Sequence, residues 1–287
     1  MEYNSYQIAD IIGVNVSTVK RWTDSGKLSC HQTLGGHRKF YLNDISDFIK
    51  RNKKIKDSIN IRHLVGKNSK LIDAINELNT TYLINYCYRT LIRGDKESFI
   101  SLSNSLILKG HPLHLIFDEI LIPILIKIGD QWSKNKLSIS AEHLASEIIR
   151  KFLSNLNFQH SPDKSRYNAF CFTLTNDKHE IPIHMAEAML NSNSNIKTFN
   201  LGPSLPVDDF INLSKKIRPD IIFISIIYIQ DIEILNKEIK TLFNHFKAST
   251  TKIFLSGSGM NSLNLDDLDY FKVNSFKSFQ TKISTTN

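Results

Sequence analysis

The sequence predicts a multidomain protein with a small helical module that carries a β-hairpin, then a helical bundle, then an α/β sheet. Apolar residues recur at helical spacing in short segments before residue 55 and in longer segments from residue 71 to 156. From residue 168 to 276, short β-branched and aromatic runs alternate with helical stretches, as in a parallel sheet. With 287 residues, 41% of them hydrophobic, the chain is long enough for two or three domains with real cores.

Composition argues against several classes of protein. The longest apolar runs are interrupted by charge or are shorter than the roughly 20 residues that span a bilayer. We expect no signal peptide, because Met1 leads directly into EYNSYQIADII. Cys30, Cys87 and Cys171 are widely separated and odd in number, which argues against a disulfide framework or a zinc site. A soluble cytoplasmic protein without a membrane partner is therefore expected.

The positive charge is concentrated at the amino terminus. Residues 1–54 hold nine Lys or Arg and five Asp or Glu, a net charge of +4. Half of the chain's formal charge of +8 therefore lies in less than a fifth of its length. A basic segment of this kind favours a polyanionic partner.

The first segment, SYQIADIIGVNVSTVKRWTDSGKL, predicts two short helices around a tight turn. Ser5 is expected to cap the first helix, and Gly13 to end it. Ser17 is expected to cap a second helix that turns Val19 and Trp22 inward. The outward side chains of this second helix are hydroxyls and cations, which suit the major groove of DNA: Ser17, Thr18, Lys20 and Arg21. A helical hairpin with a solvated basic face is the alternative.

The next segment, LSCHQTLGGHRKFYLNDISDFI, predicts a β-hairpin followed by a helix from Asn43. An extended piece leads into a Gly35-Gly36 turn and a basic return strand, which Phe40 and Tyr41 anchor. Such a hairpin forms a wing on a helix-turn-helix. Its tip is expected to offer cations to DNA phosphates.

Residues 3 to about 50 resemble the DNA-binding domain of the MerR family of transcriptional regulators, both in the helix-turn-helix segment and in the wing sequence GGHRKFY. The resemblance implies double-stranded operator DNA as a partner. One such domain presents one half-site, so we expect a homo-oligomer, a dimer or a tetramer. The side chains implied to contact bases or backbone, or to belong to the wing, are Ser17, Thr18, Lys20, Arg21, His37, Arg38 and Tyr41.

Charge and periodicity also indicate the domain boundaries. Residues 51–70 are basic and lack a strong helical period, so they are interpreted as a connector and not as a long heptad helix. The expected organisation is a winged helix-turn-helix over 1–55, a linker over 56–70, a helical bundle over 71–160 and an α/β domain over 166–287.

From Leu71 to about Leu156 the pattern predicts four amphipathic helices with short connections, and hence an antiparallel four-helix bundle. The first helix is expected to end at Gly94. The second begins with Asp95 as its cap and ends at Gly110. The third contains PLHLIFDEILIPILIKIGDQWSK, and the fourth contains SISAEHLASEIIRKFLSNL.

Within the bundle, Trp132 is followed ten positions later by Glu142 and then His143, near the start of the fourth helix. Taken singly, these residues are more often a core aromatic, a first-turn acid and a surface imidazole. Together, GDQWSKNKLSISAEHLAS resembles the helical cap of cobalamin-binding modules. The resemblance implies that Trp132 covers the upper ligand of a corrinoid, with Glu142 and His143 beside it.

The carboxy-terminal half predicts a doubly wound, Rossmann-like parallel sheet. Candidate strands are NAFCFTLT, KTFNLG, DIIFISII, TKIFLSG and FKVNSF, and helices near 182–192, 206–217 and 231–246 separate the first four. Ligands of such sheets bind beyond the carboxyl ends of the strands. Asp177, Lys178 and His179 follow the first strand and are therefore expected at the binding edge.

The segment DKHEIP resembles the lower-ligand motif of cobalamin-binding domains, although a histidine in a surface loop is the alternative for His179 alone. The resemblance implies that His179 binds cobalt and that Asp177 orients it through the other ring nitrogen. It also places Ser225 and Gly257 near the cofactor. The full implied set of cofactor-binding residues is Trp132, Glu142, His143, Asp177, His179, Ser225 and Gly257.

Three positions differ from the resembled patterns. Pro182 replaces the glycine of the lower-ligand motif, and Ser256 replaces the first residue of a Gly-Gly pair, which reduces the room for the nucleotide tail of a cobalamin. Pro182 suits the first turn of the following helix, so the fold need not suffer. Ser133 stands where light-sensing members commonly have a histidine directly after the cap tryptophan.

The order of modules resembles the light- or B12-responsive repressors of the CarH and LitR group, in which adenosylcobalamin holds an oligomer on operator DNA and light releases it. The resemblance implies a transcriptional regulator and photoreceptor, not an enzyme, with adenosylcobalamin as the expected cofactor. One alternative is a regulator of the same fold that responds to another ligand or to a partner protein. Another is a corrinoid methyltransferase subunit, which would have no use for GGHRKFY.

Overall fold

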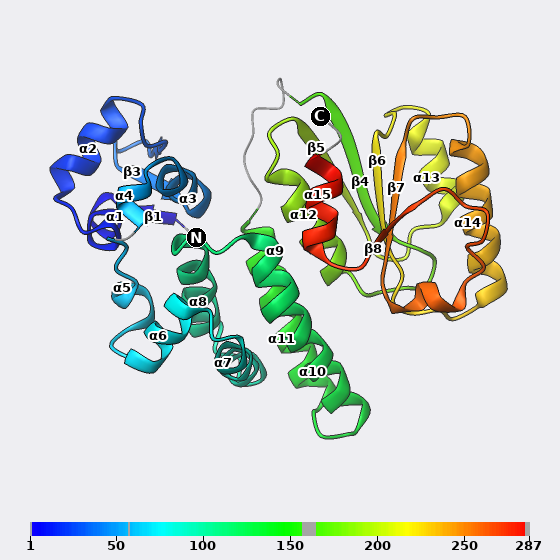
Figure 1. Cartoon of the computed structure of the whole chain (residues 1–287), viewed down its shortest axis with the longest axis horizontal. Helices are drawn as coiled ribbons and strands as arrows, with labels where there is room; N and C mark the ends of the chain where they lie inside the picture. The colour runs from blue at the N-terminus through cyan, green and yellow to red at the C-terminus, as the bar shows by residue number, and fades with distance from the viewer. Residues whose placement is uncertain (1, 57, 157–164, 285–287) are drawn as a thin grey trace. The chain divides into compact units, whose positions relative to one another are not determined.

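The computed structural model describes residues 2–56, 58–156 and 165–284, which form two compact units, Met1–Leu156 and Asn157–Asn287 (Figure 1). Each unit is described by itself. Among the described residues, none of the helices combines the length and the apolar character needed to cross a membrane.

The first unit begins with the predicted winged helix-turn-helix. Its three strands form an antiparallel sheet in the order β1-β3-β2. Val19, Phe40 and Phe48 are buried at its centre, and Trp22 packs on Phe48 with ring centroids 4.8 Å apart. The elements are β1 (Glu2–Asn4), α1 (Ser5–Ile12), α2 (Val16–Asp24), β2 (His31–Gln32), β3 (Arg38–Tyr41) and α3 (Leu42–Arg51).

The helix starts differ from the predicted ones. Asn4, not Ser5, caps α1, because its side-chain oxygen accepts hydrogen bonds from Tyr6 N and Gln7 N. Asn15, not Ser17, caps α2 in the same way, with Ser17 N at 3.0 Å from Asn15 Oδ1. In both cases an amide oxygen just upstream reaches the free N–H groups of the first turn. Gly13 ends α1 in a left-handed conformation, as predicted.

The segment predicted as a linker contains two short helices, α4 (Lys53–Lys56) and α5 (Arg62–Val65). Two hydrogen bonds attach it to the end of α1. Ser58 Oγ donates to Ile12 O at 2.9 Å, and Asn60 N donates to Ile11 O at 2.7 Å. The connecting segment therefore packs on the winged domain.

The helical bundle follows, with one break that the sequence pattern did not predict. The first predicted helix is two helices, because Leu78 adopts a left-handed conformation (φ 53°) and Asn79 caps the next helix. The third predicted helix contains a π-helical turn, and Pro123, which has no N–H to donate, lies two positions after its last residue. The elements are α6 (Ser69–Glu77), α7 (Thr80–Ile92), α8 (Lys96–Leu108), α9 (Leu113–Ile116), η1 (Phe117–Leu121), α10 (Ile122–Ser133) and α11 (Ile139–Ser154).

The winged domain packs against α8 within the first unit. Asn104 Nδ2 on α8 donates a hydrogen bond of 2.9 Å to the hydroxyl of Tyr3, and both residues are buried. Burial raises the pKa of Tyr3, and the hydrogen bond from Asn104 offsets this only in part. A second contact lies just beyond α11, where Leu156 O accepts a hydrogen bond of 3.3 Å from Asn43 Nδ2 on α3.

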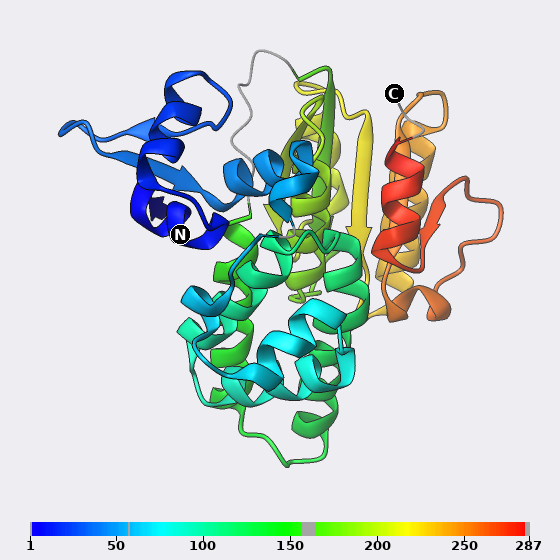
Figure 2. The same ribbon diagram turned by 60° about the vertical axis from the view of Figure 1, so that its left-hand side comes forward.

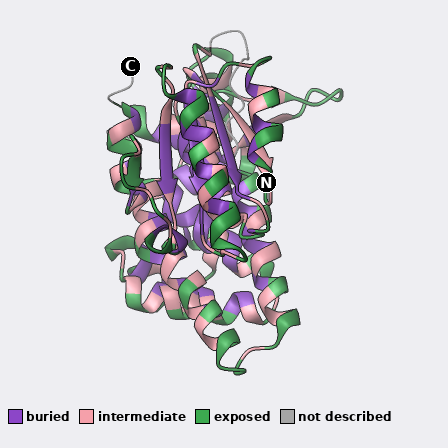
Figure 3. Cartoon of the chain, turned by 90° about the vertical axis from the view of Figure 1, so that its right-hand side faces the viewer, coloured by how far each residue is buried: buried purple, intermediate pink, exposed green. Residues whose placement is uncertain are grey.

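The second unit is the predicted doubly wound sheet, with five parallel strands in the order β5-β4-β6-β7-β8. The helices α12 and α15 cover one face, and α13 and α14 cover the other (Figure 1). The central strands are buried between these layers (Figure 3). The elements are β4 (Tyr167–Thr173), α12 (Ile181–Asn191), β5 (Ile196–Gly202), α13 (Val207–Ser214), β6 (Ile221–Ser225), α14 (Ile232–Phe246), β7 (Lys252–Ser256), η3 (Ser258–Ser262), β8 (Phe271–Val273) and α15 (Phe276–Ser284).

Candidate corrinoid site and DNA interface

The carboxyl ends of β4 and β6 lie side by side, and the loop after β4 carries the predicted cobalt ligand. Asn176 turns this loop with a left-handed conformation (φ 68°), which asparagine tolerates better than most residues. The next residue, Asp177, is fully buried, whereas His179 is exposed. The two residues of the motif therefore lie in very different environments.

The carboxylate of Asp177 accepts four hydrogen bonds. Its Oδ1 atom accepts from His179 Nδ1 at 2.7 Å and from His179 N at 3.1 Å. Its Oδ2 atom accepts from Ile227 N at 2.7 Å and Tyr228 N at 3.2 Å, in the loop after β6. Burial works to raise the pKa of Asp177, but the hydrogen bonds from His179, Ile227 and Tyr228 outweigh it and hold this pKa below its usual value.

An ionised carboxylate at Asp177 decides the tautomer of His179. Because a carboxylate without a proton can only accept, His179 Nδ1 must carry the hydrogen in the 2.7 Å contact. In the neutral ring, Nε2 is then the nitrogen with the lone pair. The side chain of His179 is 54% exposed, so this imidazole suits binding a metal from outside the sheet.

A second set of hydrogen bonds supports the loop. The Thr173 hydroxyl donates to Asp177 O, and Ser204 N lies 3.1 Å from the same oxygen and 2.8 Å from Thr173 Oγ1. Ser204 Oγ accepts from Asn176 N at 2.9 Å. The sequence pattern gave no reason to select Thr173 or Ser204, because Ser204 lies on a different loop, 27 to 31 residues from the residues that it contacts.

Ser225 ends β6 and is fully buried, yet its hydroxyl has no hydrogen-bond partner among the described residues. Buried hydroxyls are nearly always hydrogen-bonded. A polar atom of a bound ligand would satisfy Ser225, so this position fits a cofactor at the same edge as Asp177.

Gly257 has a local structural role. Its φ is 108°, and a Cβ atom there would lie 2.1 Å from Ile226 O. Ile226 N also donates to Ser256 O at 2.8 Å, and Gly259 N donates to Ile226 O at 2.9 Å. Glycine is therefore required at 257 by the close approach of the loops after β6 and β7.

Pro182 and Ser256, which replace expected glycines, lie within regular elements of the fold. Pro182 lies in the first turn of α12, as predicted. Ser256 Oγ donates to Val273 O at 3.4 Å, on the neighbouring strand. The Asp177 and His179 pair and the unsatisfied Ser225 hydroxyl thus fit a corrinoid, while Pro182 and Ser256 add volume where glycines were expected.

The predicted cap residues lie around the connection between α10 and α11 in the first unit. Trp132 is 48% exposed, which rules out the interpretation as a core aromatic. Glu142 and His143 lie in the first turns of α11, as predicted. Glu142 Oε2 is 2.5 Å from His143 Nδ1, and Glu142 Oε1 accepts from Ser146 at 2.7 Å.

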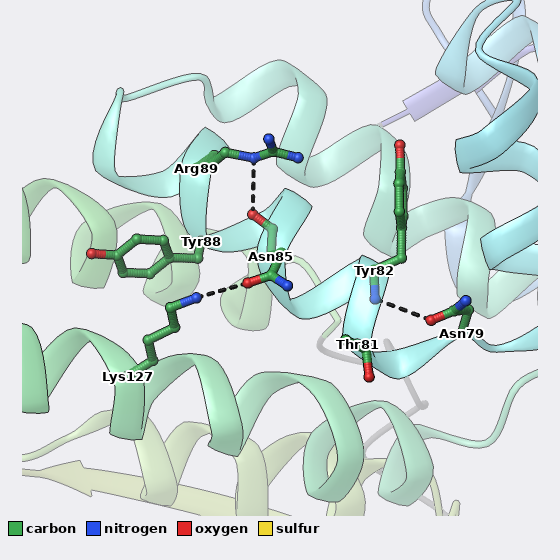
Figure 4. Close-up of a pocket in the computed structure, with 7 residues that line it drawn as sticks. All are labelled: Asn79, Thr81, Tyr82, Asn85, Tyr88, Arg89 and Lys127. Carbon is green, nitrogen blue, oxygen red and sulfur yellow. Dashed lines mark hydrogen bonds between the residues drawn. The ribbon is translucent and has the colours of Figure 1, made fainter.

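A separate groove of about 800 Å³ runs along α7 and α10, and it contains none of the predicted cofactor-binding residues. Figure 4 shows Lys127 reaching toward Asn85, with Nζ 2.8 Å from Asn85 Oδ1 and 4.6 Å from the centre of the Tyr88 ring. The lining residues are Asn79, Thr81, Tyr82, Asn85, Tyr88, Arg89 and Lys127.

On the winged domain, most of the predicted DNA-binding side chains reach the surface. Ser17, Lys20 and Arg21 are exposed on α2, and Thr18 is half-buried. Ser17 Oγ donates to Asn15 Oδ1 at 3.0 Å. The outward face predicted for the second helix is thus present on α2.

The wing differs from its prediction at the tip. Thr33 N donates to His37 O, which closes the hairpin so that the tip is Leu34-Gly35-Gly36 and contains no cation. The expectation of a cationic tip was wrong, because the basic residues come after the turn, on β3.

The other predicted wing residues lie below this tip. His37 is exposed, but Arg38 is only 21% exposed and pairs with Asp24 at 2.5 Å. Tyr41 is half-buried and stacks on His31 with ring centroids 4.6 Å apart. Arg38 and Tyr41 therefore also hold the wing together.

Comparisons with families of known proteins match the winged domain and the helical bundle. A helix-turn-helix domain model matches residues 3–53, and a B12 binding domain model matches residues 83–157. The HTH-type transcriptional repressor CarH of Myxococcus xanthus is 22% identical over 242 residues, which are 78% of this chain and 80% of that protein.

One solved structure supports the fold of the helical bundle and the sheet. The monomethylamine corrinoid protein of Methanosarcina barkeri superposes with a TM-score of 0.55 at 12% identity, over 72% of this chain and 99% of that one. A cobalamin-binding protein of Desulfitobacterium hafniense DCB-2 has a TM-score of 0.35 at 16% identity, over 79% of this chain and 98% of that one. The first of these shares the fold of a helical region followed by a Rossmann-like sheet.

Proposed function

From a chain that joins a helix-turn-helix domain to B12-binding-type domains and is a distant relative of CarH, we propose a transcriptional regulator whose DNA binding is controlled by cobalamin. Adenosylcobalamin is the expected form, and binding of this cofactor is expected to change the oligomeric state. A dimer or tetramer would join several modest half-site contacts and so multiply the effective affinity for an operator.

The observation that carries this proposal is the pair of Asp177 and His179. A buried, ionised carboxylate holds the proton on His179 Nδ1, and the imidazole is exposed at the carboxyl edge of the sheet. A surface histidine without a ligand gains little from a buried carboxylate that four donors must stabilise. Orientation of a metal-binding imidazole explains this arrangement.

Three of the predicted residues then have a defined role in binding the cofactor. His179 Nε2 would bind the cobalt, Asp177 would keep the proton on Nδ1, and the Ser225 hydroxyl would bind a polar group of the cofactor. A bound adenosylcobalamin would supply a cobalt–carbon bond that light can break, and a light response would depend on this bond. The other residues proposed at the cofactor are Trp132, Glu142 and His143 in the cap, and the backbone of Gly257.

DNA binding is assigned to the winged domain. The exposed hydroxyls and cations of α2 would enter the major groove, and β3 would approach the backbone. The proposed contact residues are Ser17, Thr18, Lys20, Arg21, His37, Arg38 and Tyr41.

The test is a visible absorption spectrum of the full-length protein after incubation with adenosylcobalamin in the dark, before and after green light. We expect a retained corrinoid with a base-off, histidine-on spectrum in the wild type. His179→Ala should lose the histidine-on features, because it removes the nitrogen ligand. His63→Ala is the control, since His63 is an exposed histidine in the first unit.

Unchanged spectra in His179→Ala would remove His179 as the ligand. A colourless wild-type protein would favour the second candidate, a regulator of the same fold that responds to another ligand or to a partner protein. Pro182 and Ser256 are the observations that favour this second candidate, because both add volume at expected glycine positions. Gel filtration of the dark and illuminated protein then tests whether the cofactor changes the oligomeric state.

A further inference from the structure

The tip of the wing presents one apolar side chain on a well-defined turn. Leu34 is fully exposed. Thr33 N donates to His37 O at 3.0 Å, and Gly36 N donates to Thr33 O at 2.8 Å, so the three residues between Thr33 and His37 form a closed loop. Gly36 has a left-handed conformation (φ 74°), which suits the last position of such a loop. Figure 2 shows the hairpin projecting from the winged domain.

The wing is held in a fixed orientation relative to α2. Asp24 is the last residue of α2 and Arg38 the first of β3, and their ion pair of 2.5 Å joins the two elements. The stacking of Tyr41 on His31 ties β3 to β2. Leu34 therefore projects from the same rigid domain that carries the exposed Lys20 and Arg21.

The side chains of the tip do not suit a phosphate. Cations and hydroxyls are the side chains that bind phosphates, and Leu34, Gly35 and Gly36 have neither, so the tip could offer only backbone N–H groups. Turn positions favour polar residues or glycine, so a leucine there serves no purpose in the turn itself. Single exposed apolar residues are common on protein surfaces. This one, however, lies at the end of a hairpin on a proposed DNA-binding domain.

We propose that Leu34 is an apolar wedge that enters the minor groove beside the major-groove site of α2. Leucine is one of the side chains that DNA-bending proteins insert between base steps, where it partly unstacks them and bends the duplex. Pyrimidine–purine steps are the easiest to unstack, so the wing would favour operators with such a step at its position. This inference rests on the proposed DNA-binding function.

The test uses full-length protein and duplexes that the wild type recovers from a random-sequence pool, with and without adenosylcobalamin in the dark. Affinity is measured by fluorescence anisotropy, and bending by energy transfer between dyes at the duplex ends. Leu34→Ala should weaken binding about tenfold, equivalent to about 1.4 kcal/mol, and remove most of the bend. The salt dependence should not change, because no phosphate contact is lost.

Two further variants complete the experiment. Leu34→Met should keep the bend, because methionine is also an apolar wedge of similar volume. Ile126→Ala is the matched control, since Ile126 is an exposed aliphatic residue on α10 (67% exposed) and should change neither affinity nor bend.

A Leu34→Ala protein with wild-type affinity and bend would overturn the inference and leave DNA binding intact. Tighter, more salt-dependent binding by Leu34→Lys, with the bend unchanged, would also overturn it, because the tip would then face phosphates. A wild-type protein that recovers no duplex in either cofactor state would overturn the proposed DNA-binding function, and this inference with it.

Discussion

At the scale of single residues, Asp177 is the most constrained position of the candidate site. It is fully buried and charged, and four hydrogen-bond donors stabilise its carboxylate. Two of these donors, the amides of Ile227 and Tyr228, come from the loop after β6. The carboxylate therefore joins the loops after β4 and β6 as well as orienting His179.

This arrangement predicts a pH-dependent stability. The folded-state pKa of Asp177 lies below the ordinary value of about 3.9. The stabilisation is therefore present above pH values near 4 and is lost as the pH falls through the folded-state pKa. Asp177→Asn should lower the free energy of unfolding at pH 7 by about 1–3 kcal/mol and should reduce the loss of stability in acid.

Urea unfolding of both proteins, followed by circular dichroism between pH 3 and pH 7, measures this effect. Asp209→Asn is the control, because Asp209 is an exposed aspartate on α13 of the same unit. Equal acid sensitivity in the wild type and Asp177→Asn would contradict the assignment of a lowered pKa.

At the scale of elements, the ion pair between Arg38 and Asp24 gives the wing a defined position. Arg38 was expected to contact phosphate, and its side chain is instead largely covered and paired with the end of α2. Part of its guanidinium is already used within the domain. An arginine side chain has several N–H donors and is always charged. Arg38 can therefore hold the wing in position and also contact the DNA backbone.

Salt dependence separates the two roles of Arg38. Arg38→Ala should weaken binding to all duplexes and lower the slope of log affinity against log salt by about one phosphate contact. Asp24→Ala is the matched variant, because it breaks the ion pair but keeps the guanidinium, so its slope should stay at the wild-type value. An Arg38→Ala protein with the wild-type slope would show that Arg38 acts only on the position of the wing.

At the scale of the first unit, the winged domain and the bundle are joined by the buried hydrogen bond between Asn104 and Tyr3. The contact lies between β1 and α8, about 100 residues apart in the chain. A change in the bundle that shifts α8 would therefore reach the sheet of the winged domain directly. This gives the proposed sensor a physical connection to the proposed DNA-binding surface.

A double-mutant cycle tests this connection. Asn104→Leu should lower the free energy of unfolding by about 1–3 kcal/mol, because the Tyr3 hydroxyl is left buried without its donor. In Tyr3→Phe the second substitution should cost less, giving a coupling free energy of about 0.5–1.5 kcal/mol. If the two substitutions lower the free energy of unfolding additively, the hydrogen bond contributes nothing to the contact between β1 and α8. The measurement is urea unfolding of the four proteins.

Local sequence patterns are sufficient to predict most of the helices and strands of this molecule. The five strands and the helices between the first four lie where their apolar patterns predicted them, because strand and helix periods are short-range properties. The position of Asp177 and His179 after the first strand follows from the same pattern. The break at Leu78 was missed, although the following Asn79 is a typical helix cap.

Tertiary structure alone decided what these residues do. Two of the four donors to Asp177 come from residues 50 and 51 positions away, and the partner of Arg38 lies on another element. The Ser225 hydroxyl, which finds no partner in the described part of the chain, and the apolar tip of the wing became visible only when burial and turn closure were known. Periodicity reports which face of an element is apolar, whereas charge state, tautomer and exposure depend on neighbours that only the folded chain brings together.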